Sequence, residues 1–211
     1  MLRITEIFFS IQGESSHAGR PCVFVRLTGC NLRCRWCDSE YTFTGGERVE
    51  LEDVLAEVRK YGCKLVEVTG GEPLAQREAF PLIERLCDDG YEVLIETSGS
   101  IATAPVDPRA KLILDVKCPG SGEVEKNHWP NLDRLRPHDE LKFVIADRTD
   151  YEWSRDLVRA RQLDRQAVHF SPVWSELDLK TLAEWILADR LDVRLQTQLH
   201  KHIWGPNVHG V

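Results

Sequence analysis

Cys30, Cys34 and Cys37 form a Cys-x-x-x-Cys-x-x-Cys triplet within the segment Thr-Gly-Cys-Asn-Leu-Arg-Cys-Arg-Trp-Cys-Asp. Thiolates are soft ligands, so three of them in one short loop indicate zinc or an iron–sulfur cluster. A closed structural zinc site needs four ligands, and only three are local here. A [4Fe–4S] cluster held by three cysteines keeps one iron open, and at that iron a small molecule can bind and react.

Two simpler interpretations of the triplet stay open. A zinc site could be completed by a histidine or by one of the other cysteines, which would make the chain a zinc-stabilised binding module; those cysteines are Cys22, Cys63, Cys87 and Cys118. The three cysteines could also be buried as small apolar residues. The regular spacing, with Trp36 directly before the third cysteine, argues most strongly against burial by chance.

The segments that must position this loop alternate between two patterns. Short apolar runs predict buried strands, and runs with helical spacing predict helices that end near Gly62 and Gly90. The predicted strands cover residues 22–27, 65–69, 91–97, 111–117, 141–145, 167–170 and 193–198, and the predicted helices cover 51–58, 80–86, 149–162 and 179–186. This alternation predicts an α/β fold with a parallel sheet and helices outside it. About six units are too few for an eight-stranded barrel, so we expect a partial (β/α)6-type barrel.

Polar residues recur where these predicted strands end. Cys30, Gly70, Glu96, Lys117 and Ser171 each end a predicted strand or follow one closely. In such barrels the functional residues gather at the carboxyl ends of the strands. The sequence therefore predicts that these residues meet at one end of the sheet.

Bulk properties limit the function further. The chain has 211 residues, 42% hydrophobic and 29% charged, which suits a single domain over residues 1–211. Its net charge of −7 argues against a broad nucleic-acid surface. No apolar run is long enough to span a membrane, and the first residues do not resemble a secretory signal. The odd count of seven cysteines gives no disulfide framework, so we expect a cytoplasmic protein.

The triplet, with its aromatic residue before the third cysteine, resembles the cluster loop of the radical S-adenosylmethionine (SAM) enzymes. Six further stretches resemble the 7-carboxy-7-deazaguanine synthase family within that superfamily. They are Glu6–Glu14, Gly19–Arg26, Thr69–Pro73, Glu96–Gly99, Asp115–Lys117 and Gln196–His200. Together they extend from the N-terminal residues nearly to the last one.

The resemblance implies a carbon–nitrogen lyase that converts 6-carboxy-5,6,7,8-tetrahydropterin to 7-carboxy-7-deazaguanine and releases ammonia, a step toward queuosine-type 7-deazapurines. SAM would bind the open iron of a [4Fe–4S] cluster, and one-electron reduction would release a radical that attacks C6 of the substrate. A flavodoxin or ferredoxin would supply the electron. The resemblance also implies a homodimer that contacts neither nucleic acid nor membrane directly.

The resemblance implies two sets of binding residues. SAM would contact Trp36, Cys37, Asp38, Gly71, Glu72, Asp115, Val116, Lys117, Ser171, Pro172, Val173 and Trp174, and the pterin would contact Ile11, Gln12, Gly13, Glu14, Arg26, Thr69, Gln198 and His200. Glu96 would bind the pterin or transfer protons, as the catalytic residue. Taken alone, the residues leave other roles open: Trp36 could pack in the core, Lys117 could lie on the rim, and Glu96 could form a buried ion pair with Arg26.

The resemblance also implies that Ser39 ligates Mg²⁺ together with the substrate, and a hydroxyl is the kind of hard oxygen ligand that Mg²⁺ prefers. From sequence alone Ser39 is equally a helix N-cap. The short spacing between the first two cysteines implies a thin cover over the cluster. A glycyl-radical activase shares the triplet and the Gly-Gly-Glu turn, but the Ile-Gln-Gly-Glu loop and Arg26 favour a small carboxylated ring. Residues 204–211 either cover the site or contact a partner subunit.

Overall fold

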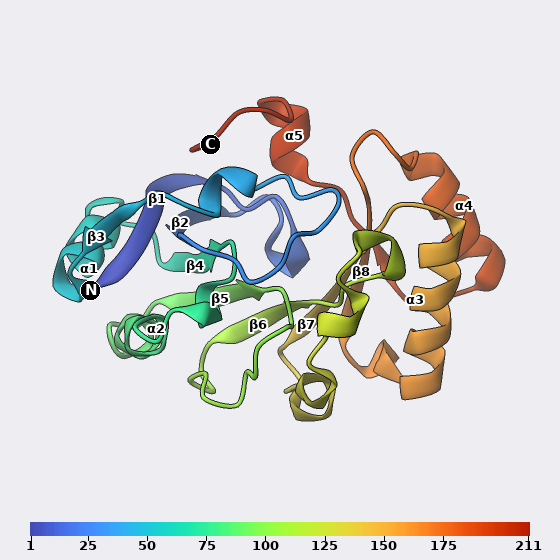
Figure 1. Ribbon diagram of the computed structural model, residues 1–211, viewed down its shortest axis with the longest axis horizontal. Coiled ribbons are helices and arrows are strands. Elements are labelled where there is room, and N and C mark those ends of the chain that lie inside the picture. The colour runs from blue at the N-terminus through green and yellow to red at the C-terminus, as the bar shows by residue number, and fades with distance from the viewer.

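A single nine-stranded sheet organises the protein, as the computed structural model, which describes residues 1–211, shows (Figure 1). The strand order is β3-β1-β2-β4-β5-β6-β7-β8-β9. The strands are β1 (Leu2–Ile11), β2 (Pro21–Leu27), β3 (Glu47–Val49), β4 (Leu65–Gly70), β5 (Glu92–Thr97), β6 (Lys111–Asp115), β7 (Glu140–Ile145), β8 (Ala167–Pro172) and β9 (Arg194–Leu195). From β2 to β9 all neighbours are parallel, whereas β1 pairs antiparallel with β2 and β3.

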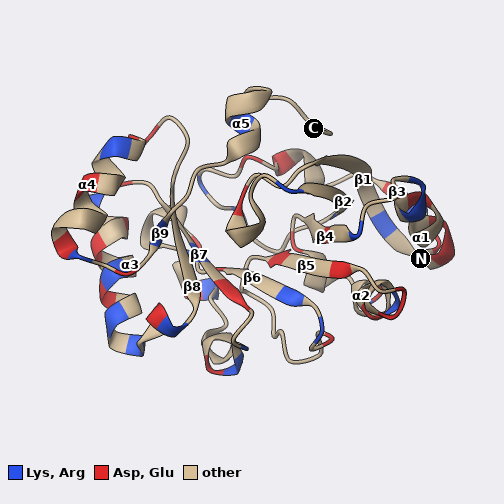
Figure 2. Ribbon diagram, turned by 180° about the vertical axis from the view of Figure 1, so that it is seen from behind, with Lys and Arg blue, Asp and Glu red and all other residues tan.

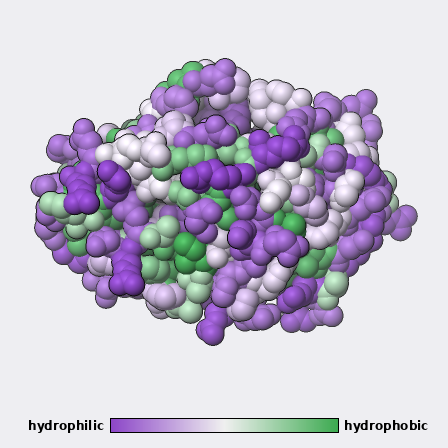
Figure 3. Space-filling view, in the orientation of Figure 1, coloured by the Kyte–Doolittle hydropathy of each residue, from purple (hydrophilic) through white to green (hydrophobic).

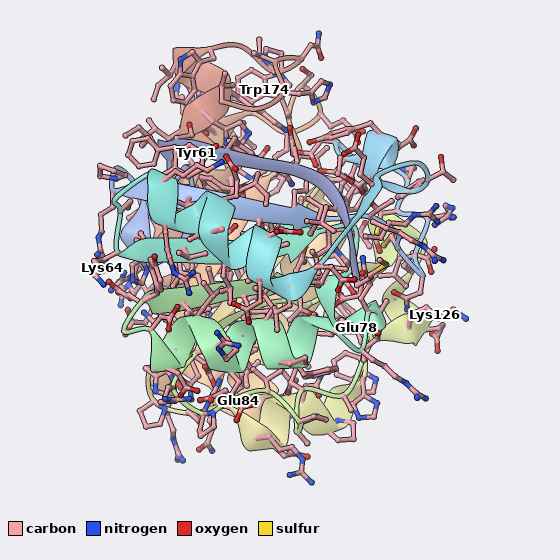
Figure 4. The ribbon with its side chains drawn as sticks, turned by 90° about the vertical axis from the view of Figure 1, so that its left-hand side faces the viewer. Tyr61, Lys64, Glu78, Glu84, Lys126 and Trp174 are labelled. Carbon is pink, nitrogen blue, oxygen red and sulfur yellow. The ribbon has the colours of Figure 1, made fainter.

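Helices cover the outer face of this sheet in two groups. The helices are α1 (Leu51–Lys60), α2 (Ala79–Asp88), α3 (Arg148–Arg161), α4 (Leu179–Asp189) and α5 (Leu199–Ile203). Helices α1 and α2 lie side by side at one end of the sheet, and α3 and α4 cover the other end (Figures 1 and 4). The open sheet with helices outside confirms the predicted α/β partial barrel.

Two hydrophobic cores attach the helices to the sheet. The larger contains 20 buried residues, among them Val25, Val68 and Ile95 from the strands and Leu55 and Leu82 from α1 and α2. The second contains 14 buried residues under α3 and α4. Just beyond α1, the hydroxyl of Tyr61 donates to the carbonyl of Ile7 in β1 (Figure 4). Helices α1 to α4 therefore bury the apolar stripes that their sequence spacing predicts.

The structure departs from the predicted elements as follows. Strands β1 and β3 and the short helix α5 were not predicted. The predicted strand at 193–198 is reduced to the two residues of β9. No α-helix was predicted between β5 and β7, and none is present; the connection from β5 to β6 is an irregular loop, and that from β6 to β7 contains short 3₁₀ turns. In place of a helix, the Asn131 side chain braces the first loop, because it accepts from the N–H of Thr103 and donates to the carbonyls of Gly99 and Ile101.

Both edges of the sheet end in very short strands, three residues in β3 and two in β9. Between these edges, charged residues lie within the central strands β5, β6 and β7 (Figure 2). No helix is both long and apolar enough to cross a membrane. On the face shown in Figure 3, hydrophobic residues occur only in small groups among hydrophilic ones.

Candidate active site

A cavity of about 500 Å³ lies at the carboxyl ends of the parallel strands. It is lined by residues from the cluster loop, from every strand between β2 and β8, and from the last part of the chain. Of the residues predicted to form the site, only Glu72 and Val116 do not line it. Those that do are Ile11, Gln12, Gly13, Glu14, Arg26, Cys30, Cys34, Trp36, Cys37, Asp38, Ser39, Thr69, Gly71, Glu96, Asp115, Lys117, Ser171, Pro172, Val173, Trp174, Gln198 and His200.

The three cysteines of the triplet are free thiols on one wall of this cavity. Each is partly buried, and the N–H of Leu32 points at the sulfur of Cys30 at 3.4 Å. Burial raises the pKa of all three thiols, and the nearby Lys117 ammonium opposes that rise. No group of three His, Cys, Asp or Glu side chains converges on a point that could hold a single metal ion. The three thiols of the triplet face the same cavity.

The Gly-Gly-Glu turn lies directly against the cluster loop. Leu27 pairs with Gly70 across β2 and β4, so the loops that follow the two strands leave the sheet together. Gly70 has φ +145°, a conformation that favours glycine, and a Cβ at Gly71 would lie 2.4 Å from the carbonyl oxygen of Gly29. The N–H of Glu72 donates to the same oxygen at 2.9 Å. The two glycines thus allow the turn to approach the cysteines.

Glu72 has a different position from the one predicted. Its side chain is fully buried outside the cavity and accepts hydrogen bonds from the N–H of Leu74, the hydroxyl of Thr97, and both the N–H and the hydroxyl of Ser98. A carboxylate with four such donors holds the end of β5 against the Gly-Gly turn. The side chain of Glu72 therefore braces the site from behind, and only Gly71 of the predicted pair lines the cavity.

Glu72→Ala is expected to lower the free energy of unfolding by about 2–4 kcal/mol, because it leaves several buried donors without an acceptor. Urea denaturation followed by circular dichroism measures this loss. Glu78→Ala is the matched control, since Glu78 is an exposed glutamate six residues further on, and we expect a change below about 0.5 kcal/mol. Equal stability of the two variants would contradict the bracing role.

The floor of the cavity is a chain of buried polar side chains. The amide of Gln12 donates to Glu67 and accepts from the N–H of Glu14, and Lys142 contacts both Glu14 and Glu96, the latter at 2.8 Å. Burial raises the pKa of Glu67 well above its usual value, and the carboxylate of Glu96 adds to this effect. In Glu96 burial acts in the same direction, but the Lys142 ammonium outweighs it and holds the pKa below its usual value.

Glu67 and Lys142 were not predicted as site residues from the sequence. Both lie in the middle of strands that are otherwise apolar, and both side chains point into the barrel. A charged residue inside a strand that is buried on both faces is costly without a partner, so its presence was a usable signal.

Arg26 and Glu96 do not pair with each other. The Arg26 guanidinium binds Glu6 at 2.8 Å and lies over the ring of Phe8, and the hydroxyl of Tyr41 also donates to Glu6. Glu96 is held by Lys142 instead. The alternative of an Arg26–Glu96 ion pair is therefore wrong. Only the Nε of Arg26 is engaged by Glu6, so its terminal N–H groups are available at the cavity.

The cavity lining beside Lys142 carries Asp115, Lys117 and the segment Ser171–Trp174. Lys117 does not lie on the rim, because its ammonium is mostly buried and binds Asp115 at 2.7 Å. The second carboxylate oxygen of Asp115 is buried without any hydrogen-bond partner. Such an unpaired acceptor beside a cavity is a site for a ligand that donates hydrogen bonds.

Comparison with known proteins agrees with this geometry. The model of the radical SAM superfamily matches residues 24–160. A protein of Koribacter versatilis named 7-carboxy-7-deazaguanine synthase is 51% identical over the full length of both chains, and one of Chlorobaculum tepidum with the same name is 44% identical over 100% of this chain and 97% of its own. The chain belongs to the 7-carboxy-7-deazaguanine synthase family. The crystal structure of QueE from Escherichia coli superposes with a TM-score of 0.76 and 25% identity over 94% of each chain.

Membership of the radical SAM superfamily implies a [4Fe–4S] cluster and S-adenosylmethionine, and the residues of this 7-carboxy-7-deazaguanine synthase family member fit both. Cys30, Cys34 and Cys37 supply three free thiols on one cavity wall. The unpaired oxygen of Asp115 supplies an acceptor on the adjoining wall. Trp36 lines the space beside them, with the Arg35 guanidinium 5.0 Å from its ring centroid on the other side.

The last part of the family member's chain covers the cavity. Helix α5 lies above the sheet (Figure 1), and residues 206–211 complete the lining. Gln198 and Lys201 both donate to Asp38, the residue after the third cysteine. Although burial opposes it, the Lys201 ammonium holds the pKa of Asp38 well below its usual range. Residues 204–211 were expected either to cover the site or to contact a partner subunit. Residues 206–211 of this segment line the cavity, which agrees with the first role.

Ser39 lies beside the contact of Asp38 with Gln198 and Lys201. Its hydroxyl donates to Asp38 at 3.1 Å and lines the cavity, and it makes no N-cap hydrogen bond to the 3₁₀ turn that follows. Ser39 therefore occupies the N-cap position of this turn, as one alternative predicts, but its side chain makes no capping hydrogen bond and its oxygen faces the cavity.

Lys201→Met is expected to raise the KM for substrate about fivefold, because it removes a charge-assisted hydrogen bond worth about 1 kcal/mol to a half-exposed carboxylate. Steady-state kinetics measures the change, and limited proteolysis of residues 199–211 checks that the segment has loosened. Lys180→Met is the control, since Lys180 forms an exposed pair with Glu184 on α4. An unchanged KM together with unchanged proteolysis would contradict the anchoring role.

Proposed function

We propose that this chain converts 6-carboxy-5,6,7,8-tetrahydropterin to 7-carboxy-7-deazaguanine with release of ammonia, as a carbon–nitrogen lyase of 7-deazapurine biosynthesis. The observation that carries the proposal is a single cavity with two chemically different surfaces. One wall holds the free thiols of the cysteine triplet, whereas the floor and its surroundings hold carboxylates and Arg26. The full-length identity of 51% to a protein named 7-carboxy-7-deazaguanine synthase supports the same reaction.

One set of cavity residues would bind the cofactors, and another set would bind the substrate. The cysteine triplet would hold the cluster, and Gly71, Asp115 and Lys117 with the Ser171–Trp174 segment would hold S-adenosylmethionine. When bound, the two cofactors supply a carbon-centred radical that removes a hydrogen atom from the substrate, and the protein positions and shields this chemistry.

Substrate binding falls to the floor and to Arg26. The pterin ring presents adjacent N–H groups, which suit the acceptors of Gln12, Glu14 and Glu96. Arg26 would bind the substrate carboxylate with its terminal N–H groups, because a planar guanidinium matches a carboxylate in two parallel hydrogen bonds. Glu96 is ionised at neutral pH, since its pKa is lowered by Lys142, and it would accept a proton during the elimination of ammonia.

We also propose a metal ligand, an electron donor, an oligomeric state, a location and a domain organisation for this enzyme. Ser39 would give one oxygen to Mg²⁺, since its hydroxyl lines the cavity. A flavodoxin or ferredoxin would reduce the cluster. Two copies would form a homodimer in the cytoplasm, where reducing conditions protect thiolate-bound iron. The single continuous sheet supports one catalytic domain over residues 1–211.

Anaerobic reconstitution with iron and sulfide tests the proposal. We expect a brown protein that, with dithionite and S-adenosylmethionine, converts the carboxytetrahydropterin to the deazaguanine acid, followed by mass spectrometry. A colourless protein that takes up zinc in place of iron would favour a binding module. An iron-loaded protein that cleaves S-adenosylmethionine but leaves the pterin unchanged would favour an activase, and either result would overturn the proposal.

A further inference from the structure

Lys142 is a buried cation that the proposed function leaves without a role. It lies in the middle of β7, its side chain is only 7% exposed, and it points into the barrel at the cavity floor. Its ammonium contacts Glu14 from the loop after β1 and Glu96 from the end of β5. Burial disfavours the charged form of a lysine, so this position is tolerated only because both carboxylates compensate it.

The charges around Lys142 come from every element that packs on the floor. Glu14, Glu67, Glu96, Asp38 and Asp115 contribute carboxyl groups, and Arg26, Lys117, Lys201 and His200 contribute basic groups. Arg26, Lys117 and Lys201 are each paired with another carboxylate, namely Glu6, Asp115 and Asp38. Lys142 is therefore the only ammonium or guanidinium group in ion-pair contact with Glu14 and Glu96.

Two neighbouring carboxylates in a buried space do not both ionise without a cation, because each raises the pKa of the other. A carboxylic acid that keeps its proton presents an O–H donor. The aminopyrimidinone edge of a pterin presents donors as well, from its 2-amino group and ring N–H. If Glu14 or Glu96 were protonated, its O–H donor would face the N–H donors of the pterin edge. Two ionised carboxylates instead accept hydrogen bonds from these N–H groups.

We propose that Lys142 is a positioning residue that keeps Glu14 and Glu96 together as ionised acceptors for the N–H edge of the pterin ring. This inference rests on the proposed function, because it takes the ring as the ligand. The directions of the pKa shifts of Lys142 and Glu96 agree with the geometry, whereas burial raises the pKa of Glu14 and the Lys142 ammonium opposes that rise. Despite its burial, Lys142 has a pKa well above its usual value because of the two carboxylates. The pKa of Glu96 is lowered, with Lys142 as the main cause that opposes its burial.

The test measures binding of 6-carboxypterin, the unreactive aromatic form of the substrate, to the reconstituted holoenzyme with S-adenosylmethionine under anaerobic conditions. Ligand fluorescence gives Kd between about pH 5.5 and 7.5, where the pterin ring stays neutral. In Lys142→Gln and Lys142→Met we expect the pH of half-maximal affinity to rise by at least about one unit. Affinity at the acid end should fall by about tenfold relative to the unsubstituted protein.

Lys111→Gln is the matched control. Lys111 also lies in a central strand and binds a buried carboxylate, Glu140, but at the opposite end of the barrel and outside the cavity. We expect it to lower the melting temperature and to leave the pH midpoint of binding unchanged. A structural role for Lys142 would likewise lower the melting temperature without moving this midpoint.

The outcomes separate the two claims. If the Lys142 variants bind 6-carboxypterin with the unsubstituted protein's pH midpoint, the positioning role is wrong while the proposed function stands. If the unsubstituted protein does not bind 6-carboxypterin at all, the proposed function fails and the inference falls with it. Lys142→Gln keeps two amide N–H donors for the carboxylates, so a variant that folds remains available even if Lys142→Met does not.

Discussion

Cys34→Ala is expected to abolish formation of the deazaguanine acid, because it removes one of only three thiols available to the cluster. Two thiols leave the cluster without one of its protein ligands, so the variant should also lose most of its iron and sulfide after anaerobic reconstitution. Iron and sulfide analysis gives a readout that does not depend on activity, and mass spectrometry follows the product.

Cys87→Ala is the control for this substitution. Cys87 is a free cysteine near the end of α2, packed against the larger core and distant from the cavity lining. We expect it to bind as much iron as the unsubstituted protein and to turn over normally. Full iron content in Cys34→Ala, or equal iron loss in both variants, would show that the triplet does not hold the cluster.

Glu96→Gln is expected to lower kcat by about 10²–10⁴-fold, the usual contribution of a positioned proton acceptor. The substitution preserves the shape of the side chain and its place beside Lys142, but a neutral amide cannot accept the proton that leaves the substrate. Because Glu96 is ionised in the folded protein, the unsubstituted enzyme should keep its rate down to weakly acidic pH. Single-turnover measurements of product formation test this directly.

Glu92→Gln tests the same chemical change on the same strand. Glu92 is the first residue of β5, half exposed, and it binds Arg20 and His17 at the opposite end from the cavity. Exposed ion pairs contribute little, so we expect kcat to change less than about threefold. A Glu96→Gln variant with normal kcat and a raised KM would limit Glu96 to substrate binding.

Much of the fold could be predicted because its strands are short, apolar and separated by recognisable helices. Strands β4 and β7 and helices α1 and α3 lie within a residue or two of their predicted ends. Strand β1 was missed because apolar and polar residues occur on both of its faces, as its intermediate burial reflects. No helix was predicted between β5 and β7, and none is present; the loop after β5 is braced by a distant side chain, Asn131, which no local pattern indicates.

The candidate site was predictable where it follows strand ends and less so within the strands. The triplet and the Gly-Gly turn stand out by residue type alone. Glu72 was predicted as a cofactor contact. One of its four donors is the N–H of Leu74, two residues further on, but the other three come from Thr97 and Ser98 at the end of β5, and only the folded chain reveals these. Lys142 and Glu67 looked like exceptions in apolar strands, because their partners are far away in sequence.

The two short outer strands, β3 and β9, have a consequence for self-association. A row of free amide and carbonyl groups along a sheet edge invites another chain to pair with it. At one border β3 covers only Leu2–Ile4 of the ten-residue β1, so residues 5–11 of β1 have no strand on that side, whereas the other border ends in the two residues of β9. Two copies of this molecule therefore have a stretch of main chain along β1, and almost none along β9, with which to continue each other's sheet. A homodimer, as proposed here, is not limited to contacts between side chains on helices and loops.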